Sequence, residues 1–136
     1  MILEWLLISA ITTATVYNAV PEQCNCEPSI TASGYRIPME NIADIRILAM
    51  ERTMMKRHDI HYGDTIFVQG VGEYDGEWRV EDTMNRKFAG QDKIDLLVPN
   101  HIRYGKWTNV SVYKQVASVK KPEKDWRQKL IEIFGL

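Results

Sequence analysis

The chain has little of what marks several large classes of protein. Its 136 residues carry 17 basic and 18 acidic side chains, so it lacks the basic excess of a nucleic-acid-binding domain. No apolar run in the sequence approaches the length of a membrane-spanning helix. The length of the chain fits one domain of ordinary size. Its 45% apolar residues, with four Trp, are enough to build a core.

Cysteine is scarce as well. Cys24 and Cys26 are the only two, and their spacing is too close for an unstrained bridge to each other. With no histidine nearby they make a poor metal site, so we expect unlinked loop residues, with intermolecular pairing or metal capture as alternatives. His58 and His61 lie in a polar stretch that leads into a turn, which favours a solvated loop over a metal site. We therefore predict neither a metal nor a cofactor.

The middle of the chain, residues 11–116, has the pattern of short strands separated by turns. Asp75-Gly76 is a strong signal for a hairpin turn. Strands are expected at residues 11–18, 46–50, 65–69, 77–81, 93–98 and 109–114. Six or seven strands with few helices predict a small closed barrel or a sandwich, and closure is favoured because it removes exposed strand edges.

The two ends differ from this middle part. Residues 1–10 are apolar, but a basic start is missing and Glu4 interrupts the stretch, so we expect an ordered segment rather than a signal peptide. Residues 117–136 predict a polar linker with Pro122, then a short amphipathic helix over 126–134. The apolar face of that helix either packs on the barrel or docks on a partner subunit.

Three acidic residues stand out because each interrupts or follows an apolar strand: Glu51, Asp82 and Asp95. A carboxylate inside an apolar strand must face solvent, pair with a base or stay protonated, because burying its charge is costly. The pattern around Asp95 fits simple alternation with the side chain on the wet face, and also fits a functional acid. Asp82 fits either a turn cap before Thr83 or a site residue.

The order of several segments resembles the 3D domain, a family of double-psi β-barrels named for three aspartates and found in lytic transglycosylases and spore-cortex enzymes. The matching stretch runs from about residue 14 to residue 114. Its pieces are Thr15-Val16-Tyr17, Thr31-Ala32-Ser33-Gly34, Ile47 to Glu51, His61 to Val68, Val80 to Thr83, Lys93 to Leu97 and Tyr104 to Trp107. Glu51 stands where the family has its first aspartate, and Met84-Asn85 replaces the Gly-Gly that commonly follows the second.

The resemblance implies a mainly β fold, a six- to seven-stranded double-psi barrel, and non-hydrolytic cleavage of the MurNAc–GlcNAc bond of peptidoglycan. It points to Asp95 and Asp82 as catalytic residues, with Asp95 protonated near neutral pH because burial and a like charge raise its pKa. The substrate-binding residues expected beside them are Glu51, Thr31, Tyr17, Arg79 and Lys106.

A second hypothesis is a non-catalytic wall-binding or structural subunit, such as a phage tail or virion protein, built on the same barrel. The apolar ends of the chain favour it, because exposed apolar elements at both ends are typical of a docked subunit. Both hypotheses place the protein in the cell envelope or in a virion, with a glycan strand as partner and a further protein partner bound through the termini. If the protein has no signal peptide, we expect it to reach the wall as part of a phage particle, by lysis. The alternative is that a signal peptide was removed during cloning.

Overall fold

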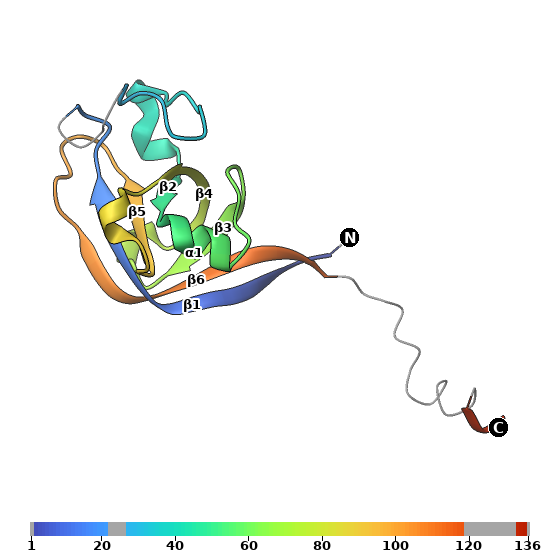
Figure 1. Cartoon of the computed structure of the whole chain (residues 1–136). Helices are drawn as coiled ribbons and strands as arrows, with labels where there is room; N and C mark the ends of the chain where they lie inside the picture. The colour runs from blue at the N-terminus through green and yellow to red at the C-terminus, as the bar shows by residue number, and fades with distance from the viewer. Residues whose placement is uncertain (1, 22–26, 119–132, 136) are drawn as a thin grey trace.

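Six strands close into a mixed β-barrel in the computed structural model, which describes residues 2–21, 27–118 and 133–135 (Figure 1). Around the barrel the strands follow the order β1-β5-β2-β4-β3-β6, with β1/β5 and β2/β4 parallel and the other neighbours antiparallel. The strands are β1 (Ile2–Tyr17), β2 (Ile47–Met50), β3 (Thr65–Gln69), β4 (Gly76–Thr83), β5 (Lys93–Leu97) and β6 (Lys106–Ser118). The prediction of a mainly β, small closed barrel is confirmed.

Helices are few and short in the described part of the chain. One α-helix, α1 (Arg52–Arg57), follows β2, and 3-10 turns span Met39–Asp44, Gly72–Tyr74 and Arg86–Phe88. None of the described helices is both long and apolar enough to span a membrane. Cys24, Cys26 and most of the linker and helix predicted for residues 117–136 lie outside the described residues.

The strands in the middle of the chain lie close to where the sequence predicted them, and β3 has the predicted bounds. The largest difference is at the N-terminus, where β1 begins at Ile2 rather than at residue 11. Residues 2–10 are therefore the first half of a barrel strand and not a separate segment. They pair with the last residues of β6, from Ile2 opposite Ser118 to Leu7 opposite Tyr113.

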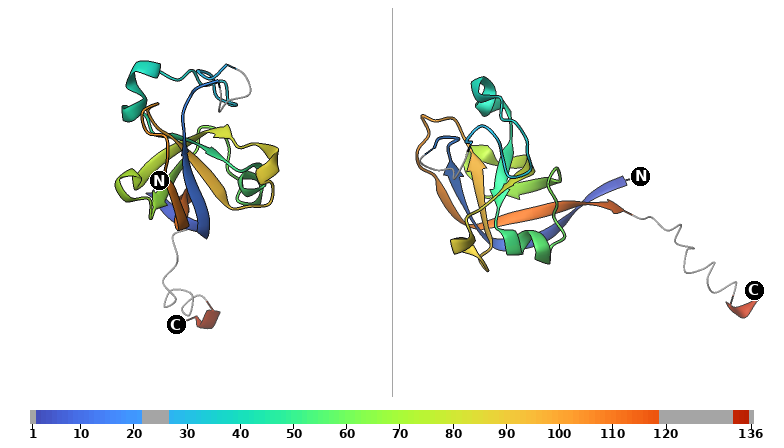
Figure 2. Two further views of the ribbon diagram at one scale, coloured as in Figure 1. Left: turned by 90° about the vertical axis from the view of Figure 1, so that its left-hand side faces the viewer. Right: turned by 45° about the horizontal axis from the view of Figure 1, so that its top comes forward.

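The first half of β1 and the end of β6 form a two-stranded arm that projects from the barrel (Figures 1 and 2). Within the described residues, β1 pairs with β5 only over residues 13–17, so the outer edge of the arm is open. Trp5 packs on Phe67 of β3, with 5.7 Å between ring centroids. Large apolar side chains are nevertheless exposed along the arm: Leu3, Trp5, Leu6, Leu7 and Ile11.

Two apolar clusters lie on opposite sides of the barrel wall. The first fills the interior and includes Leu48, Ile66, Val80, Ile94 and Leu96. The second lies outside the wall, under the loop of residues 27–46 that crosses above β2 in Figure 1, and includes Tyr17, Ile37, Ile47, Ala49 and Leu97. Because side chains alternate along a strand, β2 and β5 contribute residues to both clusters. The candidate site lies on their outer face, beside the second cluster.

Candidate functional site

The strand registers bring the predicted acids into one row across the outer face of the barrel. Thr15 of β1 lies opposite Asp95 of β5, Asp95 lies opposite Ala49 of β2, and Ala49 lies opposite Asp82 of β4. Ala49 has the smallest side chain in this row, so the wall between the two aspartates carries no bulky group. The prediction had not singled out Ala49, because nothing in its sequence surroundings distinguishes it from a core alanine.

A β-bulge in β4 turns Asp82 toward this row. Leu48 pairs with Val80, but the next residue, Ala49, pairs with Asp82, so Glu81 is an extra residue in the strand. Val80 is in the interior cluster, and regular alternation would point Asp82 inward as well. With the bulge, Asp82 instead lines the same groove as Asp95.

The groove has a volume of about 620 Å³. One wall is the outer face of the barrel, with Tyr17, Ala49, Asp82 and Asp95. The opposite side is formed by the loop of residues 27–37, which lies above the strands in Figure 1. Asn85, Lys87 and Phe88, from the segment after β4, complete it.

Asp95 is a half-buried acid with few hydrogen-bond donors. The Thr15 hydroxyl donates to Asp95 Oδ1 at 2.9 Å. Burial raises the pKa of Asp95 from 3.8 to about 6, and the nearby Asp82 charge adds to the increase, while the Thr15 hydroxyl and the Lys93 charge oppose it. At mildly acidic pH the carboxyl is therefore protonated in part, which is the state a general acid needs.

Asp82 is held in place by donors from three segments. Its Oδ1 accepts from the backbone N–H groups of Ala32 and Thr83, both at 3.0 Å, and its Oδ2 accepts from the Tyr17 hydroxyl at 3.2 Å. The alternative interpretation of Asp82, a cap before Thr83, thus describes one of its contacts. The contact with Ala32 ties the covering loop to the barrel beside Asp95.

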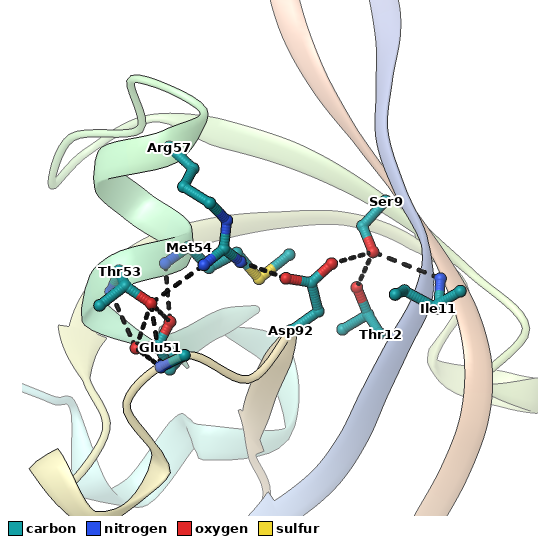
Figure 3. Close-up of polar contacts among 9 residues, drawn as sticks. Ser9, Ile11, Thr12, Glu51, Thr53, Met54, Arg57 and Asp92 are labelled. Carbon is teal, nitrogen blue, oxygen red and sulfur yellow. Dashed lines mark hydrogen bonds and ion pairs between the residues drawn. The ribbon is translucent and has the colours of Figure 1, made fainter.

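Glu51 lies at the start of α1 and has a structural function there (Figure 3). Its side chain is 1% exposed and accepts hydrogen bonds from the backbone N–H groups of Thr53, Met54 and Gly90 and from the Thr53 hydroxyl. Burial works against ionisation, but these hydrogen bonds outweigh it and hold the pKa of Glu51 below 4.5. Glu51 is not among the residues that line the groove. The structure therefore gives Glu51 a helix-capping role, and its predicted role in substrate binding stays a prediction.

Further along the same end of the barrel, Figure 3 shows a network that fastens β1 to α1. Arg57 forms an ion pair with Asp92, which accepts a hydrogen bond from Ser9 at 2.7 Å, and Thr12 donates to Ser9 at 2.8 Å. All of these polar groups satisfy one another, so the network supports the fold.

The other predicted binding residues divide between the groove and its surroundings. Tyr17 and Thr31 line the groove, but the Thr31 oxygen already contacts Ser33 Oγ at 2.8 Å and accepts from the Tyr35 backbone. Arg79 lies outside the groove, with its guanidinium 4.6 Å from the centre of the Tyr35 ring. Lys106 is exposed at the far end of the row, opposite Thr15, and does not line the groove.

The structure offers no metal centre among the described residues, where no three His, Cys, Asp or Glu side chains gather around a common point. His61 contacts Asp59 at 2.7 Å, and both side chains are mostly exposed. The donors that contact Asp95 and Asp82 are hydroxyl and backbone amide groups.

No protein-family model matches the chain, and a search of curated proteins finds no relative.

Proposed function

We propose that this barrel acts on the glycan strands of peptidoglycan as a lytic transglycosylase, in the cell envelope or as part of a virion. The observation that carries the proposal is Asp95, a carboxyl with a pKa of about 6 in a groove of about 620 Å³ that also contains Asp82. The order of motifs shared with the 3D domain supports the same assignment. In that family the chemistry needs one carboxyl that can give and then take a proton.

The reaction follows from that property. Protonated Asp95 donates its proton to the glycosidic oxygen, and the bond from C1 of the muramoyl residue to that oxygen breaks. Asp95, now a carboxylate, accepts the proton of the C6 hydroxyl of the same sugar, and the oxygen on C6 bonds to C1. The products are a 1,6-anhydromuramoyl end and a free hydroxyl on the leaving sugar, with no water consumed.

Asp82 contributes a negative charge beside the positive charge that develops at C1 as the bond breaks. Its three donors hold it in one orientation, so little reorganisation is needed during the reaction. The Thr15 hydroxyl keeps Asp95 oriented toward the groove.

The test is digestion of purified sacculi, followed by mass spectrometry of the products. We expect anhydro-muropeptides from the wild type, decreasing as the pH rises above about 6 because Asp95 then loses its proton. Asp95→Asn should lower product formation by about 10²–10⁴-fold. The matched control is Asp44→Asn, a change at an exposed aspartate outside the groove, which should leave the yield unchanged. Equal yields from wild type and Asp95→Asn would refute the catalytic assignment.

The exposed apolar arm favours a second candidate, a non-catalytic wall-binding or structural subunit. Leu3, Leu6 and Leu7 are each about half exposed and Ile11 is 71% exposed, which is unusual for a protein with no partner. The same assay separates the candidates. A subunit of this kind would bind sacculi and release no anhydro product at any pH from about 4.5 to 8.

A further inference from the structure

A second hollow, of about 740 Å³, adjoins the groove on the α1 side. Arg52, Thr83 and Asn85 line both the groove and this hollow, so one surface continues from Asp82 and Asp95 to α1. Apart from Glu51, the sequence analysis assigned no function to the residues that line only the hollow.

Three basic side chains line this hollow: Arg52, Lys56 and Arg86. Arg52 donates to the Met84 carbonyl at 3.4 Å, a long hydrogen bond that leaves most of its guanidinium donors available. Lys56 and Arg86 are exposed, and their side chains have no hydrogen bond or ion pair to any other described residue.

The acidic groups of the hollow already have their own partners. Glu51 is surrounded by backbone donors, and Asp59 contacts His61. Three cations therefore face the hollow with no carboxylate paired to them, which suits a ligand that carries its own carboxylates.

Part of the remaining lining is apolar or aromatic. Met55, Ile60, Tyr62 and Ala89 supply it, and Tyr62 is 42% exposed. A ligand that fits both parts has small aliphatic groups together with carboxylates.

From this arrangement we infer that the hollow binds the peptide stem of the same muramoyl residue that lies in the groove, an inference that rests on the proposed function. That stem is a short peptide of small side chains and free carboxylates, attached through the lactyl group at C3 of the sugar. A muramoyl residue with its C1 at Asp95 must direct its stem out of the groove within a few ångströms. The hollow shares Arg52, Thr83 and Asn85 with the groove, so it is an adjoining surface that such a stem can reach. Lys56 and Arg86 then pair with stem carboxylates, and Met55 and Tyr62 contact its methyl groups.

The inference can be tested by titrating two probes into the full chain by calorimetry: the disaccharide GlcNAc–MurNAc carrying its tetrapeptide stem, and the same disaccharide without peptide. We expect the stem-bearing probe to bind at least about fivefold more tightly, since each partly exposed ion pair contributes a modest amount. The advantage should shrink as salt is added.

Matched variants identify the residues responsible. Lys56→Gln/Arg86→Gln should lose most of the advantage, while Lys56→Arg/Arg86→Lys keeps it because the charges remain. Arg103→Gln removes an exposed cation that lines neither surface and should change nothing. Equal affinity for the two probes, or an advantage untouched by the double Gln variant, would overturn the inference.

The outcome is separable from that of the proposed function, which is judged by anhydro products from sacculi. Cleavage without a stem advantage removes the stem site and keeps the transglycosylase. A stem advantage that depends on Lys56 and Arg86, without any cleavage, keeps the site on a wall-binding module.

Discussion

Asp95 and Glu51 are two carboxyl groups shielded by the same barrel, and their pKa values move in opposite directions. Glu51 is 1% exposed, yet its pKa is lowered, while Asp95 is half-buried and its pKa rises to about 6. Glu51 accepts from three backbone N–H groups and one hydroxyl; the side-chain donor found for Asp95 in the described part of the chain is the Thr15 hydroxyl.

Burial raises the pKa of both acids; at Glu51 hydrogen bonds from several donors together outweigh it, and at Asp95 the Thr15 hydroxyl and the Lys93 charge do not. A carboxylate with several N–H donors stays charged and stabilises the fold, since hydrogen bonds to the charged form offset desolvation. A carboxyl with one donor and a negative neighbour keeps its proton to higher pH. Glu51 thus has a structural role, and Asp95 has the raised pKa that the proposed proton transfer needs.

The largest expected effect on stability comes from removing Glu51, the acid with more hydrogen-bond donors. Glu51→Ala leaves the N–H groups of Thr53, Met54 and Gly90 without their acceptor, so we expect a loss of about 3 kcal/mol in unfolding free energy at pH 7. The loss should shrink as pH falls below 4.5, because a lowered pKa contributes stability only while the folded-state carboxylate stays charged. Urea unfolding measures it, with the exposed Glu40→Ala as control. A loss that is the same at pH 3 and pH 7 would contradict this.

Replacing Asp95, the acid with one hydroxyl donor, should instead increase the free energy of unfolding. Ionising Asp95 costs stability as pH rises from 3.8 to about 6, because its folded-state pKa is raised above the unfolded value. Asp95→Asn removes that cost and should stabilise the protein by about 1–3 kcal/mol at pH 8, with no gain near pH 4. Thermal or urea unfolding at the two pH values checks it. A variant less stable than wild type at pH 8 would show that the Asp95 charge supports the fold.

Removing the hydroxyl donor of Asp95 should raise the pKa of Asp95 and so widen its difference from that of Glu51. Thr15→Val takes away a hydrogen bond that lowers the pKa of Asp95, so the pH at which anhydro product declines should move upward, by less than about one pH unit. Thr13→Val is the matched control, two residues earlier on the same face of β1. A shift to lower pH in Thr15→Val would mean that the hydroxyl favours the neutral acid.

Removing the charge of Asp82 should have the smallest effect. Its charge raises the pKa of Asp95 only weakly compared with burial, so Asp82→Asn should shift the same pH dependence slightly downward. Asparagine retains an oxygen that can accept from Ala32 and Thr83, which keeps the covering loop in place. If this shift exceeds that of Thr15→Val, charge repulsion rather than the number of donors governs Asp95.

Local sequence was sufficient to predict the position of most strands, because each has alternating polar and apolar residues or a short apolar run. Strand β3 was predicted with its observed bounds, and the acids at Asp82 and Asp95 were found because they interrupt such strands. The length of β1 could not be predicted, since residues 2–10 are apolar without a regular alternation. They become a strand only because the end of β6 pairs with them.

The sequence by itself determined that the protein is mainly β, with short strands that favour a barrel or a sandwich, and that Asp95 is an acid inside an apolar strand. Only the tertiary structure decided which acids meet. Glu51 caps α1 by accepting from the nearby N–H groups of Thr53 and Met54 and also accepts from the remote Gly90 N–H, whereas the extra residue at Glu81 turns Asp82 toward Asp95. A strand's register depends on partners far away in the chain, and a shift of one residue sends a side chain to the opposite face of the sheet.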